Sequence, residues 1–217
     1  MTSTSRARKA SPARSRHTRS GTRMPAARRR ERIVRAFIRE ALQRGSIAGV
    51  GVRAVVARAE CTAPVLYRLF GDRGGLVHAA VRSTHVPMIE RLEAIVSDHR
   101  GLPTQRLRSL ASSYLERRPG EAEAFEALVA NECRSDPVLA RFVCEVFDRF
   151  EQLLTELVIE GIERGEIGAN VDPDYVAWRI IDIGLFRNQA HLMGLKRPGR
   201  IGYGMRALES LLAEISA

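Results

Sequence analysis

Apolar residues recur every three or four positions along most of the chain, which is the spacing of one buried helix face. Proline, glycine and helix-capping residues separate these periodic segments; Asp72 and Asp136, for example, are placed to cap the helices that follow them. The pattern predicts an all-α protein with helices over residues 28–44, 51–59, 63–70, 72–100, 103–119, 121–133, 137–164, 173–195 and 201–215.

Residues 51–73 contain two short helical patterns that meet at Glu60 and Cys61. The first has apolar side chains at i, i+3, i+4 and i+7, with Arg53 directed away from them. Thr62 is a suitable N-cap for the second, and Pro64 is tolerated in its first turn because the missing N–H would have no partner there. The second helix would bury Leu66, Leu69 and Phe70, and its outward surface would carry Ala63, Pro64, Tyr67 and Arg68. This arrangement is typical of a helix-turn-helix.

The run A-x-x-A-E-C-T-x-x-x-L-Y-R-x-F-x-D-R-x-x-L resembles the DNA-binding head of TetR-like repressors. The residues that carry the resemblance are Ala59, Thr62, Leu66, Tyr67, Phe70 and Leu76, with Arg73 where the family usually has lysine. Three positions depart from the family pattern: Glu60 replaces a turn glycine, Val50-Gly51 replaces a threonine N-cap, and Gly74-Gly75 replaces acidic residues.

The resemblance implies a three-helix head with a helix-turn-helix over residues 28–73, followed by a larger effector-binding and dimerisation domain over residues 74–217. It also implies a homodimeric repressor that a small-molecule effector releases from a palindromic, double-stranded DNA operator. The effector is expected to be apolar because no buried charge is evident near the candidate pocket residues in the middle helices. Arginine and tyrosine suit phosphates, while small apolar groups can approach thymine methyls in the major groove. The DNA-contacting residues are therefore expected to be Arg53, Thr62, Ala63, Pro64, Tyr67, Arg68 and Arg73.

The last two helices are the candidates for a subunit interface. Residues 175–195 are apolar on nearly every side, which indicates burial from two directions. The final helix carries a heptad-like seam with spacings of four and three residues. TetR-like proteins pair these helices across a two-fold axis, so the expected interface is Val176, Ile180, Ile183, Ile201, Met205, Leu208, Leu212 and Ile215. The alternative is that these residues complete the core of a monomer.

The middle helices hold more aromatic residues than a tight bundle requires, and TetR-like proteins enclose a ligand there. The candidate effector pocket consists of Leu110, Tyr114, Phe125, Leu128, Phe142, Phe147 and Trp178. Aromatic residues at helical spacing are more often plain core, and that alternative stays open.

The net charge of +10 is concentrated at the N-terminus. Residues 1–30 contain ten of the 35 Lys and Arg residues and no acidic residue, so the remainder is formally neutral. Residues 1–27 are predicted to be a disordered basic arm because they lack large apolar side chains. The arm is either a solvated tail or a grip on DNA phosphates. A second functional hypothesis follows from it, namely an architectural protein that coats DNA without sequence preference.

No phosphate loop, dinucleotide fingerprint or hydrolase motif appears in the sequence, so neither an enzyme nor a cofactor is expected. A helical dimeric enzyme is the third and weakest hypothesis. Cys61, Cys133 and Cys144 have neither disulfide nor zinc spacing, and His78, His85 and His99 lack the acidic or thiolate partners of a metal site. The absence of an apolar signal segment, the polar residues of the 175–195 helix and the arginine-rich composition predict a bacterial cytoplasmic, nucleoid-associated protein outside the membrane.

Overall fold

The computed structural model describes residues 25–115, 121–195 and 202–217. These residues form helices whose order and bounds follow the sequence pattern closely. They are α1 (Ala26–Arg44), α2 (Val52–Arg58), α3 (Ala63–Phe70), α4 (Arg73–Val96), α5 (Pro103–Leu115), α6 (Glu121–Cys133), α7 (Pro137–Glu163), α8 (Pro173–Leu192) and α9 (Tyr203–Ile215). The all-α prediction is confirmed, whereas the predicted basic arm lies almost entirely outside the described residues.

The helix ends have identifiable causes. Gly45 ends α1 in a left-handed conformation, with φ of 63°, and its N–H lies within reach of the last carbonyls of the helix. Asp72 caps α4 by accepting a hydrogen bond from the Gly75 N–H at 2.7 Å, and Asp136 caps α7 by accepting from the Leu139 N–H at 2.9 Å. Both caps were predicted from the sequence.

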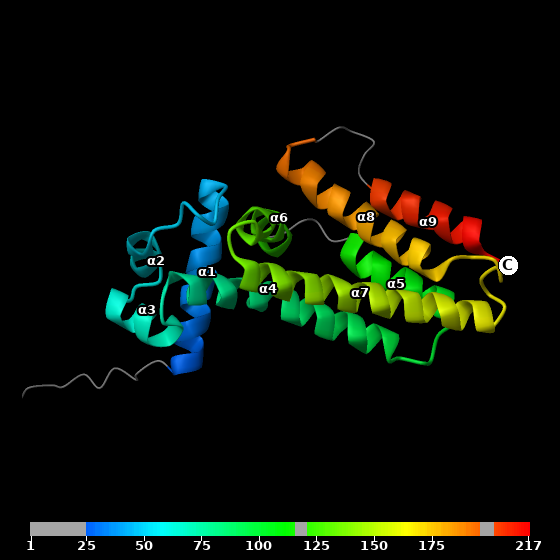
Figure 1. The fold of residues 1–217 in the computed structure, drawn as a ribbon, viewed down its shortest axis with the longest axis horizontal. Helices are drawn as coiled ribbons and strands as arrows, with labels where there is room; N and C mark the ends of the chain where they lie inside the picture. The colour runs from blue at the N-terminus through cyan, green and yellow to red at the C-terminus, as the bar shows by residue number, and fades with distance from the viewer. Residues whose placement is uncertain (1–24, 116–120, 196–201) are drawn as a thin grey trace, which may run out of the picture.

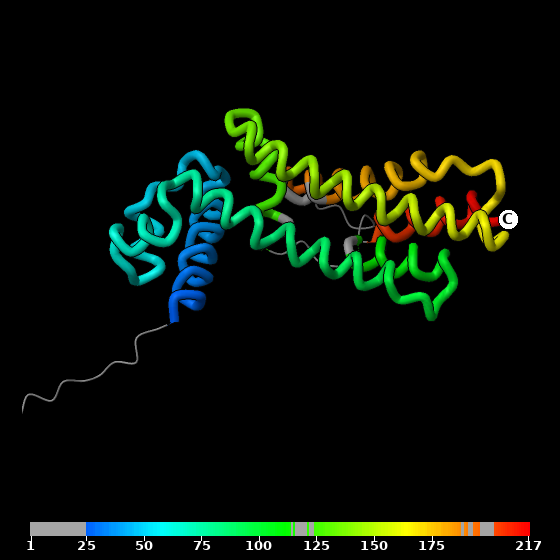
Figure 2. The backbone as a smooth tube through the Cα atoms, turned by 60° about the horizontal axis from the view of Figure 1, so that its bottom comes forward, coloured from blue at the N-terminus to red at the C-terminus, as the bar shows by residue number. Residues whose placement is uncertain are grey.

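Helices α1–α3 form a small head at one end of an elongated molecule, and α5–α9 form a larger bundle at the other (Figure 1). The long helix α4 leaves the head and runs into the bundle beside α7, as both views show (Figure 2). Helix α6 packs on α1, so the bundle also contacts the head away from α4.

The buried apolar residues form two separate clusters. The head cluster joins α1–α3 and the first half of α4 to Phe125 and Val129 of α6 and Leu139 of α7. The distal cluster joins the second half of α4 to α5, α8, α9 and the rest of α7. The core of the head therefore continues into α6 and α7 and does not stop at residue 73.

The predicted interface seam belongs to the distal cluster. Val176, Ile180 and Leu208 are completely buried within a single chain, and Leu212 and Ile215 are nearly so. Ile183 and Met205 are partly buried against the same cluster, and Ile201 lies outside the described residues. The prediction that this seam faces a second subunit is wrong for its buried members, because α8 and α9 turn these residues onto α5 and α7 of their own chain.

Candidate nucleic-acid interface

Helix α3 presents a polar and aromatic surface to solvent. Leu66 and Phe70 hold the helix to the head, with 0% and 8% of their surface exposed. On the other side Tyr67 is 46% exposed, and Arg68 and Pro64 are also exposed. The phenol of Tyr67 and the guanidinium of Arg68 are therefore accessible to a ligand on this face.

The turn before α3 fixes the direction of that surface. Glu60 has a φ of 47°, the left-handed region that a turn glycine occupies without strain. Arg32 donates a hydrogen bond to the Glu60 carbonyl at 3.3 Å. Thr62 stands at the N-cap position with extended backbone, as predicted, but its side chain makes no capping hydrogen bond within the described residues. Its exposed hydroxyl is thus left available to a partner.

Arg30 of α1 secures the other end of α3. It donates a hydrogen bond from Nη1 to the Leu69 carbonyl at 2.6 Å, and its guanidinium lies 4.5 Å from the centre of the Phe70 ring. The last carbonyls of a helix carry partial negative charge, so a cation at this end stabilises α3.

Helices α1 and α2 are joined by a buried carboxylate. Glu40 is 7% exposed and accepts hydrogen bonds from Arg58 at 2.6 Å and from Arg44 at 2.9 Å. The Arg58 hydrogen bond is the main cause that holds the pKa of Glu40 below its usual value; the Arg44 bond adds to it, and burial opposes it. The network fixes α2 on α1, which in turn positions the α2–α3 turn.

The seven predicted DNA-contacting residues do not form one surface. Arg53, Thr62, Pro64, Tyr67 and Arg68 are exposed on α2 and α3, and Ala63 is partly exposed beside them. Arg73 is directed differently: its Nη2 donates to the Ile47 carbonyl at 2.7 Å, and its Nη1 lies 3.5 Å from Glu132. These contacts favour a structural role for Arg73, which ties the loop before α2 to α4 and α6.

Contacts between polar side chains connect this head to the bundle. His78 of α4 lies 2.6 Å from the Asp136 carboxylate that caps α7, and Arg39 of α1 lies 3.2 Å from Glu121 at the start of α6. The pKa of Asp136 is lowered by its bond to the Leu139 N–H and by His78. A displacement of α6 or of the start of α7 would therefore change these contacts with α1 and α4.

No family model matches this sequence, and no curated protein matches it either. Solved structures do match. A TetR transcription regulator from Haloarcula marismortui superposes with a TM-score of 0.76 at 12% identity over 88% of this chain and 100% of that chain. SmeT of Stenotrophomonas maltophilia, the repressor of a multidrug efflux pump, superposes with a TM-score of 0.70 at 21% identity over 87% of this chain and 90% of that chain. FadR of Bacillus subtilis, solved with stearoyl-CoA, superposes with a TM-score of 0.70 at 16% identity over 85% of this chain and 98% of that chain.

The chain has the TetR-like fold. The similarity covers the head and the bundle together, because nearly the whole of each matched chain is included. The resemblance found in residues 59–76 therefore extends to the architecture of the entire described chain.

The predicted effector-pocket residues are not brought together in this TetR-like bundle. Phe125 and Leu128 belong to the head cluster, where Phe125 packs edge-on against Phe37 at 6.4 Å, whereas Leu110 and Phe147 belong to the distal cluster. Trp178 is 49% exposed on the outer side of α8, so its assignment to an internal pocket is wrong. The side chain of Tyr114 lies outside the description.

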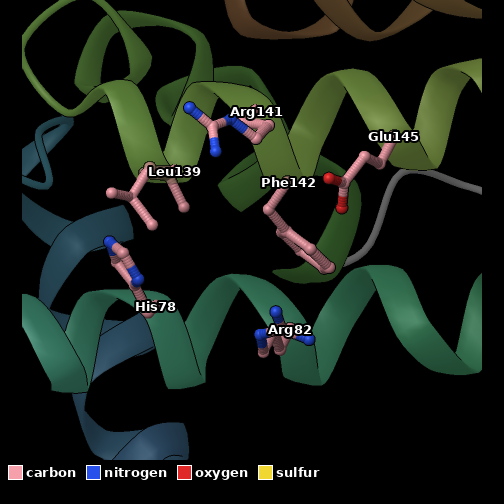
Figure 3. A pocket seen from close by; sticks show the side chains of 7 residues that line it. His78, Arg82, Leu139, Arg141, Phe142 and Glu145 are labelled. Atoms are coloured by element: carbon pink, nitrogen blue, oxygen red, sulfur yellow. The ribbon is translucent and has the colours of Figure 1, made fainter.

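Phe142, the remaining predicted residue, borders a small surface pocket between α4 and α7 (Figure 3). The pocket has a volume of about 150 Å³. The Arg82 guanidinium lies over one face of the Phe142 ring, 4.2 Å from its centre. His78 and Arg82 enter the pocket from α4, while the α7 wall consists of Val138, Leu139, Arg141, Phe142 and Glu145.

The outer side of α8 carries exposed aromatic residues that sequence reasoning did not separate from the buried ones. Tyr175 is 53% exposed, Trp178 49% and Phe186 62%, and Tyr203 at the start of α9 is 59% exposed. The α8 residues are three and eight positions apart, so they share one helix face. These aromatic side chains are therefore exposed to solvent on the same side of α8.

The described part of the chain contains no cluster of three or more His, Cys, Asp or Glu arranged to hold a metal. None of its helices is long and apolar enough to cross a bilayer.

Proposed function

We propose that this protein is a sequence-specific, DNA-binding transcriptional regulator that acts as a repressor. The observation that carries the proposal is the exposed surface of α3, where Tyr67, Arg68, Thr62 and Pro64 face solvent while Leu66 and Phe70 anchor the helix. A helix of this kind places its N-terminal residues against base edges in the major groove. The TetR-like fold, which it shares with proteins described as transcriptional regulators, supports the same conclusion.

Two substitutions test the DNA contacts. Tyr67→Ala and Arg68→Ala should each weaken binding to a selected operator by roughly 1–3 kcal/mol, because a well-placed contact of this kind has that value. Both side chains are exposed, so the thermal stability of the free protein should change little. Arg91→Ala removes an exposed arginine from the half of α4 that lies away from the head. It is the matched control and should bind the operator with wild-type affinity. Full operator affinity in both head variants would contradict the proposal.

The architectural alternative predicts different salt behaviour. Binding driven by the basic residues 1–30 would be blind to sequence and would weaken steeply with salt, because each neutralised phosphate releases counterions. A regulator should instead prefer its operator over random duplexes by a large ratio at physiological salt. Equal affinity for both duplexes, combined with a steep salt slope, would favour the architectural protein.

The regulator is proposed to be a homodimer that pairs through the outer face of α8 and the adjacent α9. The exposed Tyr175, Trp178 and Phe186 support this surface, since large aromatic residues are enriched in protein interfaces. Two heads are needed to bind the two half-sites of a palindrome. The revised interface replaces the buried seam predicted from the sequence.

A small-molecule effector is proposed to control release from DNA. Support comes from the contacts that join the head to the bundle, His78 with Asp136 and Arg73 with Glu132. A ligand that favours one arrangement of α6 and α7 would shift the position of α4 and change the spacing between the two heads. The test is a screen for compounds that raise the melting temperature and release the operator.

A further inference from the structure

Helix α4 carries a buried side chain, that of His85, with one ring nitrogen that has no hydrogen-bond partner among the described residues. His85 is 2% exposed, and the nitrogen in question is Nε2. Its Nδ1 lies 3.0 Å from both the Val81 carbonyl oxygen and the Thr84 hydroxyl oxygen, and that hydroxyl itself donates to the Val81 carbonyl at 2.9 Å. Since the carbonyl can only accept and the Thr84 proton is already used, the arrangement that satisfies all three groups places the ring proton on Nδ1. Nε2 is then a bare lone pair directed into the protein, and buried acceptors of this kind are uncommon and call for a physical explanation.

The imidazole is held in its neutral form. Burial is the main cause that lowers the pKa of His85, and it outweighs the opposing effect of the Val81 hydrogen bond. A neutral ring with the proton on Nδ1 presents an acceptor, and not a donor, at Nε2.

The position of His85 in the bundle is also particular. On α4 the residues up to Val81 pack in the head cluster, and those from Met88 onward pack in the distal cluster. His85 lies between the two, at a break in the apolar interior. On α7 it faces Phe142, whose ring lies edge-on at 6.3 Å. Phe142 also borders the pocket between α4 and α7.

We propose that His85 is a ligand-binding residue whose Nε2 accepts a hydrogen bond from the effector, so that the effector is an apolar ring compound carrying a hydroxyl or N–H donor. The inference rests on the proposed effector control and narrows its chemistry from any apolar molecule to one with a donor. An interior that hydrogen-bonds such a group discriminates strongly against an analogue lacking it, because the buried acceptor is then left unpaired. The apolar surroundings, Phe142 among them, receive the ring.

The first test needs no ligand. His85→Phe keeps an aromatic ring and removes the orphan acceptor, so the free variant should melt at a higher temperature than the wild type, as expected where a binding group is kept at the expense of stability. His99→Phe, at an exposed histidine whose Nδ1 lies 3.3 Å from the Arg106 guanidinium, is the control; it should leave the melting temperature unchanged or slightly lower, in contrast to the rise expected for His85→Phe. A lower melting temperature for His85→Phe would show that the imidazole is a structural element and would overturn the inference.

The second test uses matched probes. Binding of 2-naphthol and indole is compared with that of 2-methoxynaphthalene and 1-methylindole, which keep the rings and lose the donor. Wild type and His99→Phe should bind the donor-bearing member of each pair at least about tenfold more tightly, which corresponds to about 1.4 kcal/mol. In His85→Phe the ratio should fall to about one, and His85→Gln, which restores an acceptor oxygen, should recover part of it. In NMR spectra of protein with ¹⁵N-labelled histidine, the chemical shift of His85 Nε2 should change when 2-naphthol is added and should not change when its methyl ether is added.

The outcomes separate this inference from the function on which it rests. Probes that bind and release DNA equally well with and without a donor, or in wild type and His85→Phe alike, would overturn the role of His85 and leave effector control standing. Failure of every donor-bearing probe to bind would also overturn it. Operator binding itself is measured without any ligand, so its failure would be recognised independently.

Discussion

At the scale of single residues, the buried carboxylate of Glu40 makes the stability of the head depend on pH. Glu40 is ionised in the native head because Arg58 and Arg44 donate to it, and its pKa lies below the usual value. A carboxylate whose pKa is lower in the folded state contributes stability that is present above its unfolded pKa, near 4.5, and is lost as the pH falls through the folded pKa.

Glu40→Gln should remove that contribution. At pH 7 the variant should unfold at a lower denaturant concentration than the wild type, because two arginines lose their charged partner. Below about pH 4.5 the two stability curves should approach each other, since the carboxylate is protonated first in the unfolded chain and, at lower pH, in the folded head. Chemical denaturation across the pH range measures both. A difference that stays constant down to pH 3 would show that the charge of Glu40 does not stabilise the head.

A second residue-scale feature is the left-handed Glu60. A side chain with a Cβ in this region costs roughly 1–2 kcal/mol, and the entropy that glycine loses on folding offsets part of any gain from replacing it. Glu60→Gly should therefore stabilise the protein by about 0.5–1 kcal/mol, measured by denaturant unfolding. Destabilisation would mean that the ion pair between Arg32 and Glu60, at 3.5 Å, stabilises the protein by more than the backbone strain at Glu60 destabilises it.

At the scale of elements, the junction between α3 and α4 depends on one glycine of an adjacent pair. A Cβ at Gly75 would lie 2.0 Å from the Phe70 carbonyl oxygen, whereas a Cβ at Gly74 would approach only the Asp72 side chain, at 3.2 Å. Gly75→Ala should cost about 1–3 kcal/mol of stability and reduce DNA binding, because α3 must shift to relieve the overlap.

Gly74→Ala is the matched control for this junction. It should change stability by no more than about 1 kcal/mol in either direction, because alanine is the better helix former but its Cβ would lie 3.2 Å from the Asp72 oxygen that caps α4. Thermal unfolding of the two variants decides the matter: equal effects would contradict the proposed close approach at residue 75.

The helices themselves could be predicted from the sequence, because helical periodicity, the caps at Asp72 and Asp136, and the stop at Gly45 are local signals. The side of a helix that faces a partner could not be predicted in the same way. Helix α8 is apolar nearly all round, so its sequence does not distinguish Ile180, buried in its own chain, from Trp178, exposed beside it. That choice is made by the packing of α5, α7 and α9 against one face.

In the candidate site, too, features set by local spacing could be predicted, whereas features set by contacts between distant segments could not. The outward position of Tyr67 and Arg68 follows from the spacing of the buried Leu66 and Phe70, and it was predicted. The inward ties of Arg73 and the orphan Nε2 of His85 depend on contacts between segments far apart in the chain. Periodicity carries no signal for such contacts.

At the scale of the whole molecule, dimerisation through the outer face of α8 can be tested directly. Trp178→Glu combined with Phe186→Glu should give monomers in analytical ultracentrifugation, because two charges would be buried in an apolar interface. Both residues are exposed in the single chain, so each monomer should stay folded. Val138→Glu, at an exposed apolar residue of α7, is the control and should not alter the mass. A wild-type chain that is already monomeric at micromolar concentration would refute the interface.

The measurement that tests the central claim most directly is selection of binding sites from a pool of random DNA duplexes by the wild-type protein at about 150 mM salt. Two copies of α3 on a two-fold axis should enrich one palindromic sequence, with half-site centres about 10 base pairs apart or a multiple of that distance. Tyr67→Ala and Arg68→Ala should enrich it poorly, and the Trp178 and Phe186 double variant should lose it. A pool that stays random after repeated rounds, while the protein still retains DNA, would contradict the account.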